Sequence, residues 1–169
     1  MTPATAGDGH KTTAGDGPAL LEGVILSYRA AGMSSPGAEQ INAVRGGFDR
    51  LYGLQLLACS DSEVRAQLAV REELTQAAGL VHGGVYASMA ESMASIATAR
   101  AVRERGEVAM GLANNTSFLR PITAGVVHAH ATRLHRGRTT WVWDVRFGDD
   151  AGRTCAVTRM TVAVRPARP

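Results

Sequence analysis

The residues best placed to do chemistry are His82, Gly83, Gly84 and Glu91, which lie at the start and in the middle of one long apolar stretch. Two glycines after a histidine let a ligand approach the backbone closely, and the first N–H groups of a helix beginning there have no partner within it. The helix dipole favours an anion at that end. Glu91 is the single charge between Gly83 and Ala99, about two helical turns further on. An oxyanion site followed by a carboxylate predicts a reaction centre.

Glu91 is expected to be the catalytic group of this centre. Burial among Met89, Met93 and Ile96 would disfavour its charged form and make it a stronger base near neutral pH. Ser95 follows one turn later on the same helix face, where its hydroxyl can hydrogen-bond the carboxylate or a water molecule.

The residues alone leave structural readings open for each of these positions. Glu91 could pair with a buried arginine such as Arg133 or Arg159. His82 before a helix is more typical of a residue that bonds the backbone than of a catalytic acid, and Ser95 could be a small core residue.

The chain as a whole excludes several functional classes. Its 169 residues are 45% apolar and 20% charged, as in ordinary globular proteins. The arginines are scattered, which argues against nucleic-acid binding. No apolar run approaches the ~20 residues of a membrane span, and Cys59 and Cys155 are typical of a reducing compartment, so a cytoplasmic protein is expected. His128 and His130 have no cysteine or acidic partner at ligand spacing, so no metal site is predicted.

The pattern of apolar residues predicts one domain over residues 18–169, after a disordered tail over residues 1–17. The expected elements are a short helix at 18–30, strands at 51–57 and 64–70, the central helix from 83 to about 104, and strands at 108–119, 125–134, 139–147 and 154–164. A helix apolar on nearly all sides must be covered, so the last four strands are expected as a meander in a sheet curled around it. The fold class is therefore α+β, with an antiparallel sheet of about six strands. Its open edge predicts at least a dimer, with dimer or tetramer left open.

This layout resembles the hotdog-fold acyl-CoA thioesterases, and is most similar to the 4-hydroxybenzoyl-CoA and phenylacetate-pathway-type branch with a catalytic Glu on the central helix. The resemblance runs roughly from Leu51 to Arg168. Three blocks carry it, in the expected order: QAAGLVHGG at 76–84, SFLRP at 117–121 and TTWVWDV at 139–145.

The resemblance implies a role for each matching residue of the reaction centre. Glu91 would attack the thioester carbonyl or activate water against it, and the Gly83 N–H would polarise that carbonyl. Gln76 would support the carbonyl or the water. Ser95, often Thr in the family, would position the water, with His82 in support.

The same resemblance implies a binding site for CoA. Arg120, Thr139 and Arg168 match positions that meet the CoA nucleotide and its phosphates, and Arg138 is a weaker addition. The site would lie across a dimer interface, with the helix start and the carboxylate from different subunits, in a homodimer or dimer-of-dimers, and without a cofactor.

The expected function is hydrolysis of acyl-CoA thioesters, with a preference for aromatic acyl groups. Two alternatives remain from the sequence: an acyl-thioester dehydratase or hydratase on the same fold, and a non-catalytic acyl-CoA-binding module.

Overall fold

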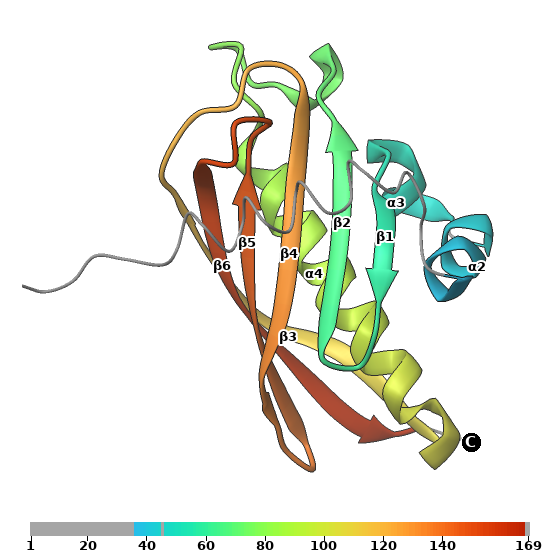
Figure 1. Cartoon of the computed structure of the whole chain (residues 1–169). Helices are drawn as coiled ribbons and strands as arrows, with labels where there is room; N and C mark the ends of the chain where they lie inside the picture. Colours follow the sequence, from blue (N-terminus) through green and yellow to red (C-terminus); the bar gives the residue numbers. More distant parts are fainter. Residues whose placement is uncertain (1–35, 45, 168–169) are drawn as a thin grey trace, which may run out of the picture.

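The structure, a computed structural model, describes residues 36–44 and 46–167 (Figure 1). The predicted tail at 1–17, the predicted helix at 18–30 and Arg168 lie outside the described residues.

Six antiparallel strands form one sheet against which the long helix α4 lies (Figure 1), and this confirms the predicted fold class. The strands are β1 (Gln55–Cys59), β2 (Glu63–Ala69), β3 (Glu107–Phe118), β4 (Val126–Arg136), β5 (Thr140–Gly148) and β6 (Thr154–Pro166), in the spatial order β1-β2-β4-β5-β6-β3. They twist around α4 because the apolar side of the sheet is covered by that helix.

The predicted meander is right for β4, β5 and β6 but wrong for β3. Instead of pairing with β4, β3 pairs along its whole length with β6, from Glu107 opposite Pro166 to Phe118 opposite Ala156. The chain after β3 therefore crosses an end of the sheet, where the Leu119 and Arg120 N–H groups donate to the carbonyl of Cys155. This crossover leaves β3 at an edge of the sheet.

The central helix α4 spans Gly83–Val102 and is followed by the 3-10 turn η2 (Arg103–Arg105), as predicted. His82 caps its start by accepting a hydrogen bond at Nδ1 from the Gly84 N–H (2.9 Å). Gly106 ends the segment at φ 68°, a left-handed conformation that glycine adopts without a Cβ clash.

Two short helices, α2 (Pro36–Val44) and α3 (Gly47–Tyr52), precede β1. The prediction that a strand begins at Leu51 is therefore wrong, since Leu51 and Tyr52 close α3. Gly53 ends α3 at φ 83°, and the extended chain starts only at Gln55. A 3-10 turn, η1 (Glu72–Leu74), links β2 to the segment before α4.

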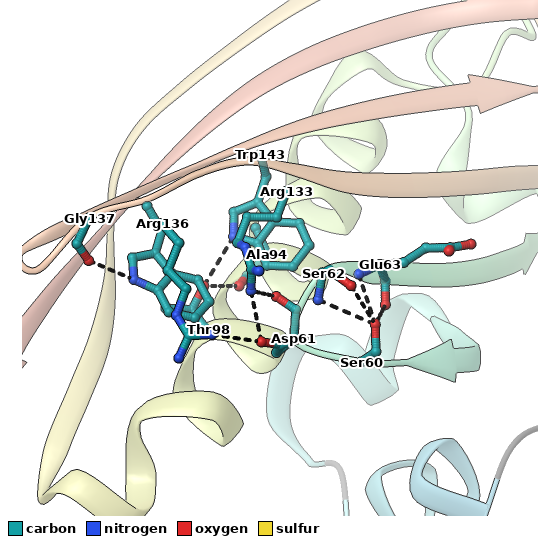
Figure 2. A network of polar contacts seen from close by, with 11 residues as sticks. Ser60, Asp61, Ser62, Glu63, Ala94, Thr98, Arg133, Arg136, Gly137 and Trp143 are labelled. Atoms are coloured by element: carbon teal, nitrogen blue, oxygen red, sulfur yellow. Dashed lines mark hydrogen bonds and ion pairs between the residues drawn. The ribbon is translucent and has the colours of Figure 1, made fainter.

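The core between α4 and the sheet holds the two tryptophans of β5, which are fully buried. The Trp143 indole N–H donates to the Thr98 hydroxyl (3.1 Å), which donates to the Ala94 carbonyl (2.8 Å), so a buried polar chain ties β5 to α4 (Figure 2). Trp141 packs under the guanidinium of Arg133, with 4.8 Å from Cζ to the ring centroid.

Candidate active site

The start of α4 presents a backbone N–H that is left for a ligand. The neighbouring amides are used: His82 N–H donates to Leu74 O (2.8 Å), Gly84 N–H to His82 Nδ1, and Val85 N–H to His82 O (2.9 Å). The Gly83 N–H, at the first helical position, has no acceptor within the helix. The positive end of the helix dipole therefore coincides with an available donor at Gly83.

His82 builds this site as a structural cap. Because its Nδ1 accepts the Gly84 N–H, the neutral ring carries its proton on Nε2.

A cavity of about 430 Å³ opens beside the Gly83 N–H. It brings together three predicted site residues, Gln76, Gly83 and Arg120, from three segments of the chain. The remaining lining residues are Leu80, Val81, Tyr86, Phe118, Leu119 and Pro121. The sequence blocks at 76–84 and 117–121 therefore meet at one place in the fold.

Local backbone structure sets Gln76 and Arg120 at this cavity. Gln76 lies in a turn in which its N–H donates to Leu80 O and its carbonyl accepts from Gly79 N–H, both 2.8 Å. The Arg120 Nη1 donates to the Thr154 carbonyl at 2.9 Å, which fixes the guanidinium at the start of β6 while the side chain remains exposed.

Tyr86 lines the cavity but is absent from the residues predicted to form the site. Burial, reinforced by the nearby Cys155 thiol, raises the pKa of Tyr86 to about 12. Its phenol therefore stays protonated at neutral pH, and its ring packs edge-on against Phe147 at 5.3 Å between centroids. The only sequence signal for Tyr86 is its position one turn after the helix start.

Glu91 lies on the exposed side of α4, beside β3. Its Oε1 is 3.5 Å from the position that a Cβ on Gly111 would occupy. The predicted burial among Met89 and Met93 is wrong for a single chain, because residues two apart on a helix point about 200° apart and both methionines face the core.

The alternative in which a buried arginine neutralises Glu91 is also wrong. Arg133 pairs with Asp61 (3.0 Å) and Arg159 with Asp144 (3.3 Å). Among residues 36–44 and 46–167, no side chain forms an ion pair with Glu91. The carboxylate is therefore available at the surface of one chain.

Ser95 lies one turn beyond Glu91, as its position in α4 requires. Its Oγ is buried and has no hydrogen-bond partner in the described part of the chain. An unsatisfied buried hydroxyl costs stability, so this atom is a ready partner for a water molecule or a ligand.

Arg138 and Thr139 lie in the turn between β4 and β5, at the opposite end of the sheet from Arg120 (Figure 1). The Thr139 carbonyl accepts hydrogen bonds from the Val164 N–H (3.0 Å) and from Arg165 Nη1 (2.8 Å), near the end of β6. One chain therefore does not bring Arg138 and Thr139 to the cavity that holds Arg120.

The described residues hold neither a metal-binding cluster nor a membrane-spanning helix. No cluster of three or more His, Cys, Asp or Glu side chains able to hold a metal occurs there. Two of the three histidines of β4 instead pair singly with acids, His128 with Asp150 and His130 with Glu63, each at 3.0 Å. None of the helices described has the length and apolar character needed to cross a bilayer.

Comparison with known proteins places these features in a family. The profile of the thioesterase superfamily matches residues 78–156. Protein Rv1847 of Mycobacterium tuberculosis is 42% identical over 124 residues, which are 72% of this chain and 89% of that protein. The 1,4-dihydroxy-2-naphthoyl-CoA hydrolase of Listeria monocytogenes is 33% identical over 122 residues, 72% of this chain and 98% of that enzyme.

A solved structure of a mutant of the thioesterase PA1618 from Pseudomonas aeruginosa matches with a TM-score of 0.74 at 35% identity, over 79% of this chain and 96% of that one. The chain therefore belongs to the thioesterase superfamily, whose hotdog fold it has, and it is a hydrolytic enzyme.

Proposed function

We propose that this protein hydrolyses acyl-CoA thioesters at a site completed by a second copy of the chain. The observation that carries the proposal is the available Gly83 N–H at the start of a 20-residue helix, in one cavity with Gln76 and Arg120. A thioester carbonyl becomes an oxyanion on attack, and a fixed donor aimed at that oxygen lowers the barrier.

The carboxylate must come from another chain. Glu91 follows Gly83 by eight residues, which is about 12 Å along a helix at 1.5 Å per residue. A carbonyl bound at the Gly83 N–H is therefore out of reach of Glu91 in the same chain.

The edge strand β3 supports pairing with a second copy. Its Val108, Met110 and Leu112 side chains are 39%, 49% and 58% exposed. Apolar side chains at a free strand edge favour association with another chain. Two β3 strands paired antiparallel would extend the sheet across a two-fold axis, the commonest symmetry of homodimers.

The contacts between β3 and α4 support the register of such a pair. Along β3, Gly111 lies by Glu91, Asn114 donates to the Ala87 carbonyl (2.9 Å), and Phe118 lies against Gly83. Antiparallel pairing centred on Asn114 would set Gly111 of one copy near Ser117 and Phe118 of the other. Glu91 of one copy would then approach Gly83 of the other.

The chemistry follows from this arrangement. Glu91 either attacks the carbonyl carbon or removes a proton from a water molecule that attacks it. The Gly83 N–H stabilises the resulting oxyanion, and collapse of the intermediate breaks the C–S bond and releases CoA as its thiolate. In the nucleophilic route, water then hydrolyses the acyl-glutamate anhydride. Ser95, one turn from Glu91, would hydrogen-bond the attacking water.

CoA would be held by arginines from both copies. In an antiparallel pair, the end of one sheet that carries Arg138 and Thr139 approaches the end of the other that carries Arg120. A guanidinium suits bidentate contact with phosphate.

We further propose that the acyl group is aromatic, in line with the naphthoyl-CoA substrate named for the Listeria relative. The test is CoA release from a panel of acyl-CoA esters, followed with a thiol-detecting dye. Glu91→Gln is expected to lower turnover by orders of magnitude while ester binding persists. Near-normal turnover of that variant would remove Glu91 from the mechanism.

A further inference from the structure

A second cavity, of about 570 Å³, lies on the other side of the α4 start, between α3 and α4. Five of its lining residues are apolar or aromatic, namely Phe48, Leu51, Tyr52, Leu74 and Val85. The polar members are Arg71, Glu73, Thr75, His82 and Ser88, with Gly84 completing the lining. The cavity is therefore an apolar space with a few polar groups at defined places, as is usual for small-molecule sites.

Two large apolar side chains of α3 are left exposed where they line this cavity. Phe48 is 62% exposed and Leu51 is 71% exposed. The Phe48 ring packs against that of Tyr52 at 5.1 Å between centroids and a 59° interplanar angle, so part of the wall is aromatic. Apolar side chains left in water beside a cavity are stabilised when a ligand covers them.

The two cavities are lined by neighbouring residues of one segment, His82 to Gly84. His82 and Gly84 line the cavity under α3, and Gly83 between them lines the cavity that contains Gln76 and Arg120. A carbonyl held at the Gly83 N–H therefore has a different space on each side. The Arg120 side offers a cation for phosphate, and the α3 side offers apolar surface.

The α3 wall is fixed to the body of the protein at both ends. Near its start, Asp49 Oδ1 accepts from the Ser92 hydroxyl (2.5 Å) and the Tyr52 hydroxyl (2.9 Å), which ties α3 to α4. At its end, Arg71 donates to the carbonyls of Leu51 (2.5 Å) and Tyr52 (3.1 Å). A wall held in this way is formed before the ligand arrives, which lowers the entropic cost of binding.

We infer that the cavity under α3 binds the acyl group of the CoA ester, and that Phe48 and Leu51 determine which acyl groups are accepted. This assignment rests on the proposed thioesterase function. A bulky, mainly apolar acyl group such as an aryl ring covers the exposed α3 side chains, whereas an acetyl group leaves them in water. The His82 Nε2–H is placed to donate to a hydroxyl or carbonyl on that ring.

The test is a binding measurement that does not depend on turnover. The probe is the phenacyl thioether of CoA, which carries an aryl ketone and has no thioester to hydrolyse, and CoA itself is the reference ligand. Leu51→Trp fills the cavity mouth, and Leu134→Trp is the matched control, since Leu134 is also exposed (52%) but lies on β4 outside the cavity. Calorimetric titration gives the affinity of each variant for both ligands.

We expect Leu51→Trp to weaken the phenacyl probe by about tenfold or more and to leave CoA unchanged, with no effect of Leu134→Trp. Phe48→Ala, a smaller change, is expected to weaken the probe in the same selective way. The assignment is overturned if Leu51→Trp affects the probe no more than Leu134→Trp, if CoA weakens equally, or if the wild-type protein binds the probe no better than CoA. Failure of the thioesterase proposal would appear separately, as absent CoA release from the acyl-CoA panel.

Discussion

The ring of Phe118 lies directly against Gly83, with its Cζ 2.7 Å from the position that a Cβ at residue 83 would occupy. Any side chain at residue 83 would displace the ring that lines the cavity beside the helix start. This contact also joins β3, at the edge of the sheet, to the amide at which catalysis is proposed.

Removing the Gly83 N–H without disturbing the helix is expected to lower kcat by about 10²–10³. Proline is accepted at the first helical position, and the φ of −63° and ψ of 137° at His82 suit a residue that precedes proline. Phe118→Ala makes room for the proline ring. The comparison is therefore between Gly83→Pro and Gly83→Ala, each made in the Phe118→Ala protein. Steady-state CoA release measures the difference, and equal rates for the two variants would show that the N–H has no catalytic role.

Mixing two inactive variants is expected to restore activity if each site uses Gly83 of one copy and Glu91 of the other. Chains carrying Glu91→Gln and chains carrying Gly83→Pro with Phe118→Ala would be refolded together in equal amounts. Half of the random dimers then hold one intact site of two, with the unchanged Phe118 beside Gly83, which gives about a quarter of the wild-type activity. A mixture as inactive as its components would mean that both groups act within one chain.

Arg120→Ala is expected to raise KM for an acyl-CoA ester by about tenfold and to leave a pantetheine thioester almost unaffected. A hydrogen bond to a charged phosphate contributes about 1.5–3 kcal/mol, and only the CoA ester has the nucleotide phosphates. Arg159→Ala is the control, since Arg159 pairs with Asp144 away from the cavity. Equal increases for both thioesters would remove Arg120 from nucleotide binding.

The carboxylate of Asp149, in the turn between β5 and β6, is expected to stabilise the fold near neutral pH and to lose this effect in acid. Burial alone would raise the pKa of Asp149, but hydrogen bonds from the Arg153 side chain and from the Arg153 and Ala151 N–H groups lower it below its usual value. Because the folded pKa lies below the unfolded value of about 3.9, this stabilisation is present above about pH 4 and is lost as pH falls through the folded pKa. Between about pH 6 and about pH 3, the free energy of unfolding measured in urea should fall less steeply for Asp149→Asn than for the wild type. Parallel curves would assign the acid sensitivity to other groups.

The sequence predicted the helix start and the elements around it with little error. The apolar stretch from Gly83 predicted α4, and strict alternation around Trp141 and Trp143 predicted β5. Both signals are local, because a helix and a strand each repeat with a fixed period that side-chain burial reveals. The sequence was less informative before β1, where alternation through Leu51 continued into residues that are helical.

Only the tertiary structure decided which side chains are covered. Val108, Met110 and Leu112 alternate along the chain as the apolar residues of a core strand do, yet all three are exposed. They belong to β3, which lies at the edge of the sheet. That position follows from the long crossover after β3, which places β4 away from it.

The same holds for the proposed site. The residue types and spacing of Gly83 and Glu91 indicated the chemistry. At about 1.5 Å per residue, however, the two residues lie about 12 Å apart along the helix, so one chain cannot bring both to the same carbonyl. Phe118 and Arg120 meet Gly83 because segments about 35 residues apart in the chain lie together, which no local periodicity specifies. Sequence therefore determined which groups are present, and packing of distant segments determined which of them share a cavity.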